Sequence, residues 1–405
     1  MYKTFVFIFF LLVEVISPVR AESGLLSSLL SLGFESISMG STDNSDWIIF
    51  EDRINRNSSD GIEDVIHEII DSPDIQKETD IILLRNRLPV LKCHLSKDLI
   101  TDYKKGIISF NDVLKGVIIV NNTDDYRLGL KKGRVVNSSS GKIDLVVYPQ
   151  VGLANYRLDK LYMIDISVAP ALEMQLWPGA KFTGQVIFPV YNNLKGEVDY
   201  IRPGIVALSQ SLRLRDNVFG CLSVGNFTED RMGVDAELNY RSNKGYWGIG
   251  ANVGLTGSST FYDGRWEVSD WKRVNFALKT FFYEPVYNLQ FDLSIGQYIY
   301  GDRGGRLDCR RHFGEILVGV FAMYSGKVAN GGFLFSIPLP GRKRKRSKKF
   351  PIRVILPEYF DWEYEAQCGP DYLNRRLGRS YRTDNDRNDE YRFNPLFIKS
   401  NLRIK

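Results

Sequence analysis

The side chains most often used in catalysis are sparse in this 405-residue sequence. Its three histidines, His67, His94 and His312, do not stand at the spacings of a metal site or a catalytic triad. Acyl-transfer enzymes need an activated nucleophile, usually one paired with a histidine base. The four cysteines are far apart and show no CxxC pair, which leaves both a disulfide and isolated thiols open. The sequence therefore predicts a non-catalytic protein with no metal and no cofactor.

The densest cluster of charge lies between residues 302 and 311. It comprises Asp302, Arg303, Arg306, Asp308, Arg310 and Arg311. Alternate residues of a β-strand share a face, so a strand with Leu307 facing outward would carry its neighbours on the inner face. That inner face would hold Arg306, Asp308 and Arg310. Two roles are open for these three residues: an internal ion-pair network that stiffens the fold, or charged hydrogen bonds to a ligand that passes along the face.

A run of like charge, RKRKRSKK, follows this region. Its basic residues are Arg342, Lys343, Arg344, Lys345, Arg346, Lys348 and Lys349. Such a run cannot continue a strand through lipid, so it predicts a loop or turn. The loop is either simply solvated or in electrostatic contact with an anionic surface, such as lipopolysaccharide phosphates or an acidic polymer. The net charge of +5 is small for this length and does not indicate a nucleic-acid partner.

Residues 1–21 have the pattern of a secretory signal peptide. Lys3 is followed by the apolar run FVFIFFLLV, and Val19-Arg20-Ala21 offers small residues at the cleavage position. The run is too short for a membrane anchor and is interrupted by Glu14. Further along, no segment has the ~18 to 20 apolar residues of a spanning helix, so any membrane crossing would be made by strands.

Residues 22–120 are predicted to form a small α+β domain. A short helix is expected over 25–32 and a strand at SDWIIFEDR. The apolar positions Ile62, Val65, Ile66, Ile69 and Ile70 recur with the period of one helix face. DIILL and LPVLKC, separated by a short polar link, are typical of a hairpin.

From about residue 143 the period of apolar residues changes to two. The alternation is clearest in 164–176, 232–240, 247–255 and 289–295, where one face is apolar. A soluble sandwich and a membrane barrel both produce this pattern. Runs of nine or more residues favour the barrel, because lipid-spanning strands need ~9 to 11 residues and globular strands average ~5 to 6. We therefore predict an antiparallel outer-membrane β-barrel of about 12 to 14 strands over 140–340. Residues 341–405 would supply the basic loop, one or more closing strands and a tail.

Several segments resemble one protein family. LGFESISM, WIIFEDRINR and DIILLRNRLPVLKC, and then LQFDLSIGQYIYGDRGGRLDCRRHFGEILVGVFAMYS and GGFLFSIPLP, are similar to the YjbH family of Gram-negative outer-membrane proteins associated with exopolysaccharide production. The late block is the most specific part. The chain departs from the family in being shorter than its double-barrel members, in lacking a lipobox cysteine and in carrying the basic run.

The resemblance implies a non-catalytic role in exporting an exopolysaccharide or capsule, or in assembling it at the surface. The barrel would lie in the outer membrane, in contact with lipid and lipopolysaccharide, and the leading domain would lie in the periplasm. Of the two roles open to Arg306, Asp308 and Arg310, ligand contact would then be contact with the polysaccharide in the lumen, and the internal ion-pair network stays the alternative. Export proteins of the periplasm or outer membrane are the expected partners. The alternative is a general porin-like channel, or a structural barrel whose periplasmic domain binds an envelope protein.

Overall fold

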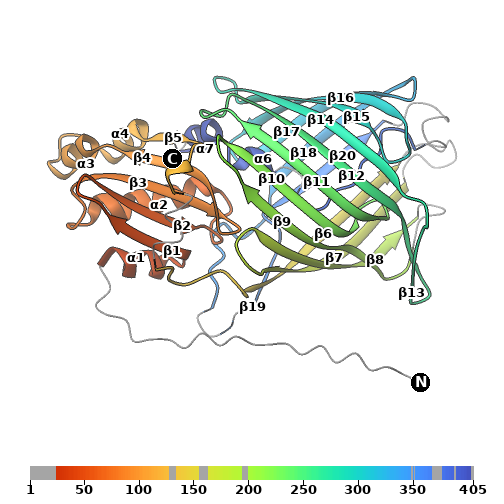
Figure 1. The fold of residues 1–405 in the computed structure, drawn as a ribbon, viewed down its shortest axis with the longest axis horizontal. Helices are drawn as coiled ribbons and strands as arrows, with labels where there is room; N and C mark the ends of the chain where they lie inside the picture. The colour runs from red at the N-terminus through yellow and green to blue at the C-terminus, as the bar shows by residue number, and fades with distance from the viewer. Residues whose placement is uncertain are drawn as a thin grey trace.

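The computed structural model describes residues 24–126, 134–154, 163–193, 199–347, 350, 352–366, 376–386 and 389–402. The predicted signal peptide, Lys348, Lys349 and Cys368 lie outside these ranges. The described chain is mainly β and contains two sheets, one of five strands and one of fifteen. The five-stranded sheet and its helices lie at one end of the larger sheet (Figure 1).

The N-terminal domain has the α+β composition that the sequence predicts. Its elements are α1 (Gly24–Leu32), β1 (Glu35–Ser41), β2 (Ser45–Glu51), α2 (Ser58–Asp71), β3 (Glu78–Arg85), β4 (Leu88–Leu95), α3 (Lys97–Lys104), α4 (Phe110–Gly116) and β5 (Ile118–Val120). The strand order is β1-β2-β3-β4-β5. The pair β2 and β3 is parallel, and the crossover between them is α2, as parallel neighbours require.

Local sequence explains the two predicted elements that organise this domain. Helix α2 begins where the side chain of Asn57 accepts a hydrogen bond from the backbone N–H of Ser59, and its whole predicted apolar stripe is buried. The hairpin of β3 and β4 turns through Asn86 and Arg87, whose φ angles of 49° and 60° suit a two-residue turn. The predicted hairpin is therefore confirmed. The predicted helix over 25–32 is confirmed as well, because it corresponds to α1.

The large sheet begins at residue 143, where the two-residue alternation begins. Its strands are β6 (Ile143–Ala154), β7 (Met163–Gln175), β8 (Ala180–Asn192), β9 (Arg202–Arg213), β10 (Val218–Phe227), β11 (Arg231–Arg241), β12 (Trp247–Tyr262), β13 (Arg265–Val268), β14 (Arg273–Glu284), β15 (Leu289–Gln297), β16 (Arg303–Phe313), β17 (Ile316–Ser325), β18 (Val328–Pro338), β19 (Ile352–Ile355) and β20 (Tyr359–Glu365). All neighbours are antiparallel except β19 and β6. In the described chain thirteen strands, β6–β18, lie within 140–340, which agrees with the predicted 12 to 14, and β19 and β20 follow that range.

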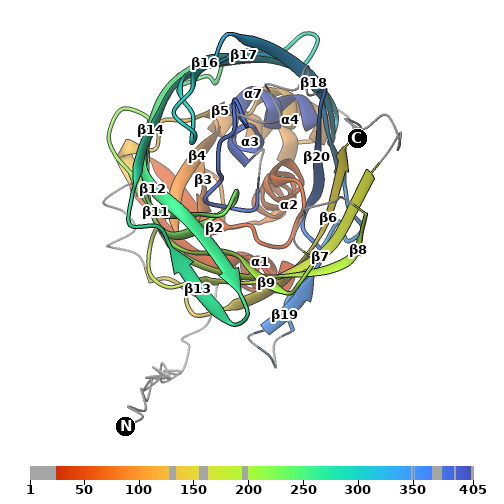
Figure 2. The same ribbon diagram turned by 90° about the vertical axis from the view of Figure 1, so that its right-hand side faces the viewer.

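The sheet curls until its two edges approach each other. Its strand order runs from β19 and β6 to β18 and β20, and β19 and β20 are successive strands joined by residues 356–358. Among the described residues no ladder joins β6 directly to β20, so a closed barrel is not confirmed. Across this seam the indole N–H of Trp362 donates to the carbonyl of Val151 at 2.8 Å. Figure 2 shows the strands arranged around the C-terminal segment.

The two faces of the large sheet have opposite character. Apolar side chains point outward and remain uncovered: Leu278 is 65% exposed and Val320 59%. Many polar side chains on the inner face are buried, among them Asp235, Gln290 and Asp308. The distribution is the reverse of a soluble sandwich, whose apolar face is the buried one. No helix in the described ranges is both long enough and apolar enough to cross a membrane.

The end of the chain follows a path that the sequence did not suggest. We expected closing strands and a tail after residue 340, and β19 and β20 do join the sheet. Residues 376–386, α6 (Asp389–Arg392) and α7 (Pro395–Asn401) then lie inside the curled sheet or at its mouth beside the N-terminal domain (Figures 1 and 2). We call residues 376–386 and 389–402 the interior segment.

Candidate functional site

The three charged residues predicted to share a face on β16 do so. Leu307 is 48% exposed on the outer surface, and the side chains of Arg306, Asp308 and Arg310 are largely covered on the inner one. The guanidinium of Arg306 makes two hydrogen bonds to Asp308, at 2.9 and 2.8 Å, and two more to Glu363 of β20, at 2.9 and 3.0 Å. Paired contacts of this kind are the strongest hydrogen bonds that arginine makes.

Arg310 extends this network along the wall. Its side chain lies 3.4 Å from Asp308 and 3.4 Å from Asp292 of β15. Together with Glu363 the network ties β15, β16 and β20 across the interior. The geometry is that of the predicted internal ion-pair network, and polysaccharide contact by these residues stays a prediction. The rest of the sequence cluster is dispersed: Asp302 accepts a backbone hydrogen bond from Gly378, and Arg311 is exposed.

The basic run lies against the N-terminal domain. Arg342 makes two hydrogen bonds to Asp60, at 2.8 and 3.1 Å, and the ammonium of Lys343 lies 2.7 Å from Asp64. Both acids belong to α2. The main chain is held as well, since the backbone N–H of Arg56 donates to the carbonyl of Arg342 at 3.0 Å. The expected loop is therefore partly anchored to the protein, although the side chains of Arg342 and Lys343 remain about half exposed.

Arg346, further along the run, lies beside a buried acid. Asp144, at the start of β6, has a side chain that is 3% exposed and accepts hydrogen bonds from three arginines. These are Arg53 at 2.7 Å, Arg346 at 2.5 Å and Arg353 at 2.6 Å. Arg344 and Lys345 donate to the backbone carbonyls of Pro357 and Ser31. These contacts join the N-terminal domain, the run and the sheet edge, and contact with an anionic surface stays a prediction.

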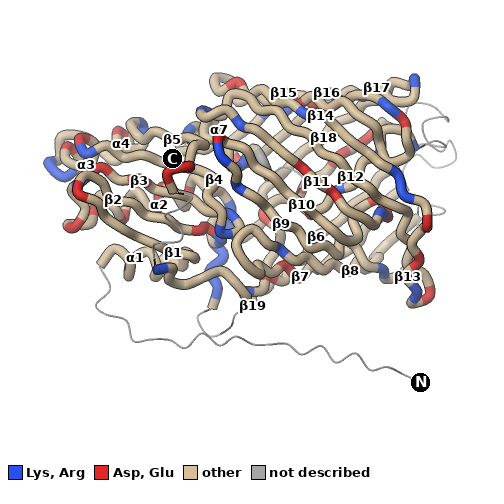
Figure 3. The backbone as a smooth tube through the Cα atoms, viewed as in Figure 1, with Lys and Arg blue, Asp and Glu red and all other residues tan. Residues whose placement is uncertain are grey.

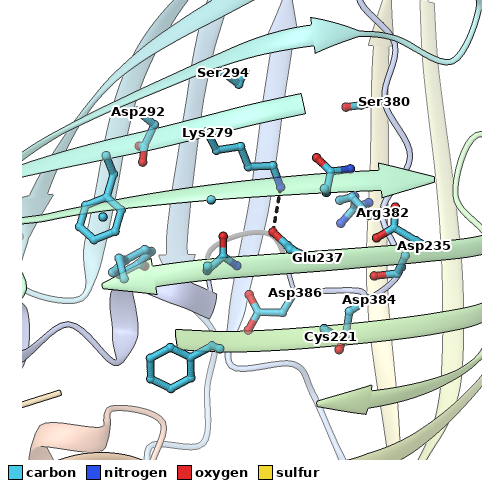
Figure 4. A pocket seen from close by; sticks show the side chains of 18 of the residues that line it. Cys221, Asp235, Glu237, Lys279, Asp292, Ser294, Ser380, Arg382, Asp384 and Asp386 are labelled. Atoms are coloured by element: carbon cyan, nitrogen blue, oxygen red, sulfur yellow. Dashed lines mark hydrogen bonds and ion pairs between the residues drawn. The ribbon is translucent and has the colours of Figure 1, made fainter. Parts of the chain in front are cut away.

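Two cavities lie on either side of the interior segment. One has a volume of about 690 Å³ and lies between residues 376–386 and the wall of β10–β16. The other, of about 1090 Å³, lies between the loops of the N-terminal domain, β6–β9 and the same segment. Figure 4 shows the first cavity with charged and polar side chains on both sides, including Lys279, which lies 3.0 Å from Glu237.

The interior segment is bonded to the wall on several sides. The hydroxyl of Tyr381 donates to Asp235 at 2.7 Å. The backbone N–H of Arg382 donates to the hydroxyl of Thr228 at 2.8 Å, and the backbone N–H of Thr228 donates to the carbonyl of Arg382 at 3.1 Å. A Cβ atom at Gly254 would lie 1.7 Å from that hydroxyl, so only glycine leaves room for Tyr381. Burial and the carboxylate of Asp235 raise the pKa of Tyr381, which keeps its hydroxyl protonated as a donor.

An ion pair holds the segment at a further point. The ammonium of Lys181 on β8 lies 3.0 Å from Asp384. Burial opposes ionisation of Asp384, but the neighbouring charge of Lys181 outweighs it and lowers the pKa of Asp384 below its usual range. The carboxylate therefore stays charged and paired. Together with the contacts of Tyr381 and Arg382, this pair fixes the segment between β8, β10 and β11.

Helix α7 joins both parts of the molecule. Ile398 and Leu402 belong to the buried core of the N-terminal domain, whereas Phe397 packs with apolar residues of the large sheet. The ammonium of Lys399 donates to three backbone carbonyls at the end of α4, those of Leu114, Lys115 and Val117, at 2.8, 2.8 and 2.5 Å. The sequence carried a signal for this helix that we did not use: Asn394 caps it and Pro395 stands at its first turn.

The three histidines and the three cysteines that the structure describes are not brought together. His67 lies 3.1 Å from Asp71 on the surface, His94 lies 2.8 Å from Asp80, and His312 is buried among aromatic rings. Cys93, Cys221 and Cys309 are free thiols. Within the described ranges no group of three or more His, Cys, Asp or Glu side chains is arranged to hold a metal ion.

Comparison with known proteins decides the family. A family model described as "Exopolysaccharide biosynthesis protein YbjH" matches residues 22–340. The chain belongs to the YjbH family. The match covers the N-terminal domain and the large sheet through β18, and its description supports a role in exopolysaccharide production. In this YjbH-family chain, the basic run and the interior segment follow the matched range. No curated protein and no solved structure matches the chain.

Proposed function

We propose that this chain is an outer-membrane β-barrel component of exopolysaccharide or capsule export, or of assembly at the surface, and that it acts without catalysis. The proposal rests on family membership together with the character of the large sheet. In it, the curled sheet crosses the membrane and its seam at β19 and β20 completes the barrel. The partners are membrane lipid and lipopolysaccharide outside, the polymer inside, and export proteins of the envelope.

The observation that carries the proposal is the uncovered apolar outer face. Leu278, Ile295 and Val320 are each more than half exposed, and they belong to three different strands. Exposing such a face to water would cost a free energy of roughly 25 cal/mol for each Å² of apolar surface. Strands β6–β12 and β14–β18 are 9 to 16 residues long, enough to cross the hydrocarbon region at ~9 to 11 residues. Lipid is the environment that suits this surface.

The strand connections support a periplasmic position for the N-terminal domain. Connections 176–179, 214–217, 285–288 and 314–315 are short, and they lie at the end of the sheet that faces this domain. The backbone N–H of Gly179, for example, donates to the carbonyl of Asn86 at 2.8 Å. The opposite end carries the long β12–β13 hairpin (Figure 1). Short turns face the periplasm in bacterial barrels of this type, whereas long loops face outward.

The occupied interior favours export over a general open channel. Residues 376–386 divide the space inside the sheet into two cavities, and both are lined by charged and polar side chains. An open porin would offer a continuous aqueous path. A polymer exporter instead needs an interior that stays closed until substrate or a partner arrives.

Deletion of the gene tests the proposal. Surface exopolysaccharide should fall strongly, the cytoplasmic synthesis enzymes should keep their activity, and polymer should collect in the periplasm. The wild-type protein should fractionate with the outer membrane and run faster on gels before heating than after it. Normal surface polysaccharide in the deletion strain would overturn the export role.

A further inference from the structure

We propose that the 690 Å³ cavity beside the interior segment is a binding site for an uncharged, hydroxyl-rich sugar chain, and that it discriminates against acidic polysaccharides. This inference rests on the proposed export function and specifies the substrate class. The volume lies within the ~300 to 1,000 Å³ typical of ligand pockets. The wall of the cavity is built by six neighbouring strands, β10–β12 and β14–β16, so its side chains are held on rigid elements.

The first observation is an unsatisfied acceptor on β15. Gln290 is 6% exposed and lines the cavity. Its amide N–H donates to Asp292 at 2.8 Å, which fixes the orientation of the amide group. No donor among the described residues reaches its carbonyl oxygen. Buried amide oxygens are normally paired, so this atom indicates a donor supplied from the cavity.

A second acceptor lies on β12. The side-chain oxygen of Asn252 also has no donor among the residues that the structure describes, and Asn252 lines the same cavity. The inner face of β12 is otherwise nearly free of side chains, because Gly248, Gly250 and Gly254 alternate with its outward residues. The wall of this cavity therefore carries two amide oxygens that no described donor reaches.

Three cations of this wall are already paired with carboxylates. Lys279 lies 3.0 Å from Glu237, as Figure 4 shows. The guanidinium of Arg306 is hydrogen-bonded to Asp308, and that of Arg310 lies 3.4 Å from Asp292. A ligand would therefore meet acceptors in need of donors together with carboxylates. Hydroxyl groups satisfy both, whereas uronate or phosphate groups would add negative charge beside Glu237 and Asp292.

An aromatic ring completes the match to a sugar. Phe281 of β14 lines the cavity, and its ring lies against Gly248, where a Cβ atom would come within 2.3 Å of it. A sugar ring has an apolar face of C–H groups and an edge of hydroxyls. Phe281 offers a surface for that face, while Gln290 and Asn252 offer acceptors for the hydroxyls.

Binding to the full-length folded protein in detergent micelles tests the inference by calorimetry. The probes are uncharged heptasaccharides derived from dextran, cellulose and galactan, and an oligogalacturonate of the same length. At least one uncharged probe should bind, and oligogalacturonate should bind at least about tenfold more weakly. Equal or tighter binding of oligogalacturonate, or no binding of any uncharged probe, would overturn the inference.

A matched pair of variants on β15 assigns the site. Gln290→Met removes the unsatisfied acceptor and should weaken binding of the uncharged probe by roughly 3- to 10-fold. Gln297→Met makes the same change on the same strand outside the cavity and should leave binding unchanged. Equal affinity of the two folded variants would overturn the assignment.

Two further measurements keep the outcomes separable. If Gln290→Met does not fold, Asn252→Leu replaces it under the same prediction, and the comparison of probes on the wild-type protein is unaffected. Reduced surface polysaccharide in the deletion strain together with no preference for uncharged probes would leave the export role standing and remove this site. Normal surface polysaccharide in the deletion strain together with the expected probe preference would remove the export role and leave this binding site standing.

Discussion

The guanidinium of Arg306 is paired with two carboxylates. One belongs to Asp308, two residues further along the same strand, and the other belongs to Glu363 on β20. The two-residue period predicted that Arg306 and Asp308 would share the inner face. It could not predict Glu363, because that contact depends on how the last strand joins β18. Single-strand periodicity therefore gives the face of a residue, and its partners follow only from the sheet order.

Arg306→Gln should lower the temperature at which the folded protein unfolds in detergent. Removing one member of a largely buried ion-pair network takes from Asp308 and Glu363 the guanidinium to which both are hydrogen-bonded, which costs about 3 to 5 kcal/mol. The measurement is the shift in gel mobility on heating. The matched control is Arg311→Gln, an exposed arginine on the same strand, and it should change little.

A charge-neutral version checks the cause. Combining Arg306→Gln with Asp308→Asn and Glu363→Gln removes the two carboxylate charges together with the guanidinium charge, while retaining side chains of similar shape. Heat resistance should recover in part. A triple variant as unstable as Arg306→Gln alone would show that the network does not stabilise the fold through its charges.

At the scale of elements, helix α7 links the N-terminal domain to the large sheet. The sequence predicted α1, α2 and the β3–β4 hairpin from their own periodicity and turn residues. It did not predict that the core of this domain includes Ile398 and Leu402, which come from the other end of the chain. A seven-residue helix has too weak a pattern of its own to show which core it will join.

The isolated N-terminal domain should therefore be less stable than the same domain in the whole chain. A fragment of residues 22–126 should gain thermal stability when a peptide of residues 389–405 is added, because the peptide fills the gap left by Ile398 and Leu402. Circular dichroism at increasing temperature measures the gain. The Ile398→Asp peptide is the control and should give none. Equal effects of the two peptides would contradict this role for α7.

We expect the loop between β2 and α2 to make the stability of the domain depend on pH. Burial raises the pKa of Asp52 from 3.8 to about 7, against the backbone hydrogen bonds that it accepts from Asn55 and Ile54. The folded protein then holds a proton that the unfolded chain releases near pH 4, so stability should fall as pH rises from about 4 to about 7.

Asp52→Asn should remove this dependence, since the amide keeps an oxygen that can accept from the backbone and cannot ionise. The stability of the variant relative to the wild type should therefore be greater at pH 8 than at pH 4. Chemical unfolding of the full-length protein at these two pH values measures it. A constant difference between variant and wild type would show that Asp52 does not titrate across this range.

At the scale of the whole molecule, we expect the interior segment to keep the curled sheet closed. The sequence predicted an apolar outer face, and the structure shows this distribution. It gave no sign that residues 376–386 would lie inside, because their contacts with Thr228, Asp235 and Lys181 are between residues at least 146 positions apart. Long-range placement of a polar segment leaves no periodic trace in the sequence.

The wild-type protein in a planar bilayer should therefore show little ion conductance. Replacing residues 376–386 by a Gly-Ser linker of equal length, while keeping α7, should open a conducting path, since the linker loses the bonds of Tyr381, Arg382 and Asp384 to the wall. The double variant Arg342→Gln and Lys343→Gln, which leaves the interior unchanged, is the control. High conductance of the wild-type protein would indicate a general channel instead.

The central claim is that the large sheet crosses the outer membrane with its apolar face in lipid. Spin labels placed one at a time along β15, in a chain whose four cysteines are replaced by serine, test it most directly in reconstituted membranes. Labels at 291, 293 and 295 should be accessible to oxygen dissolved in lipid, and labels at 290, 292 and 294 to a water-soluble nickel complex. Water accessibility at all six positions, without the two-residue alternation, would contradict the account.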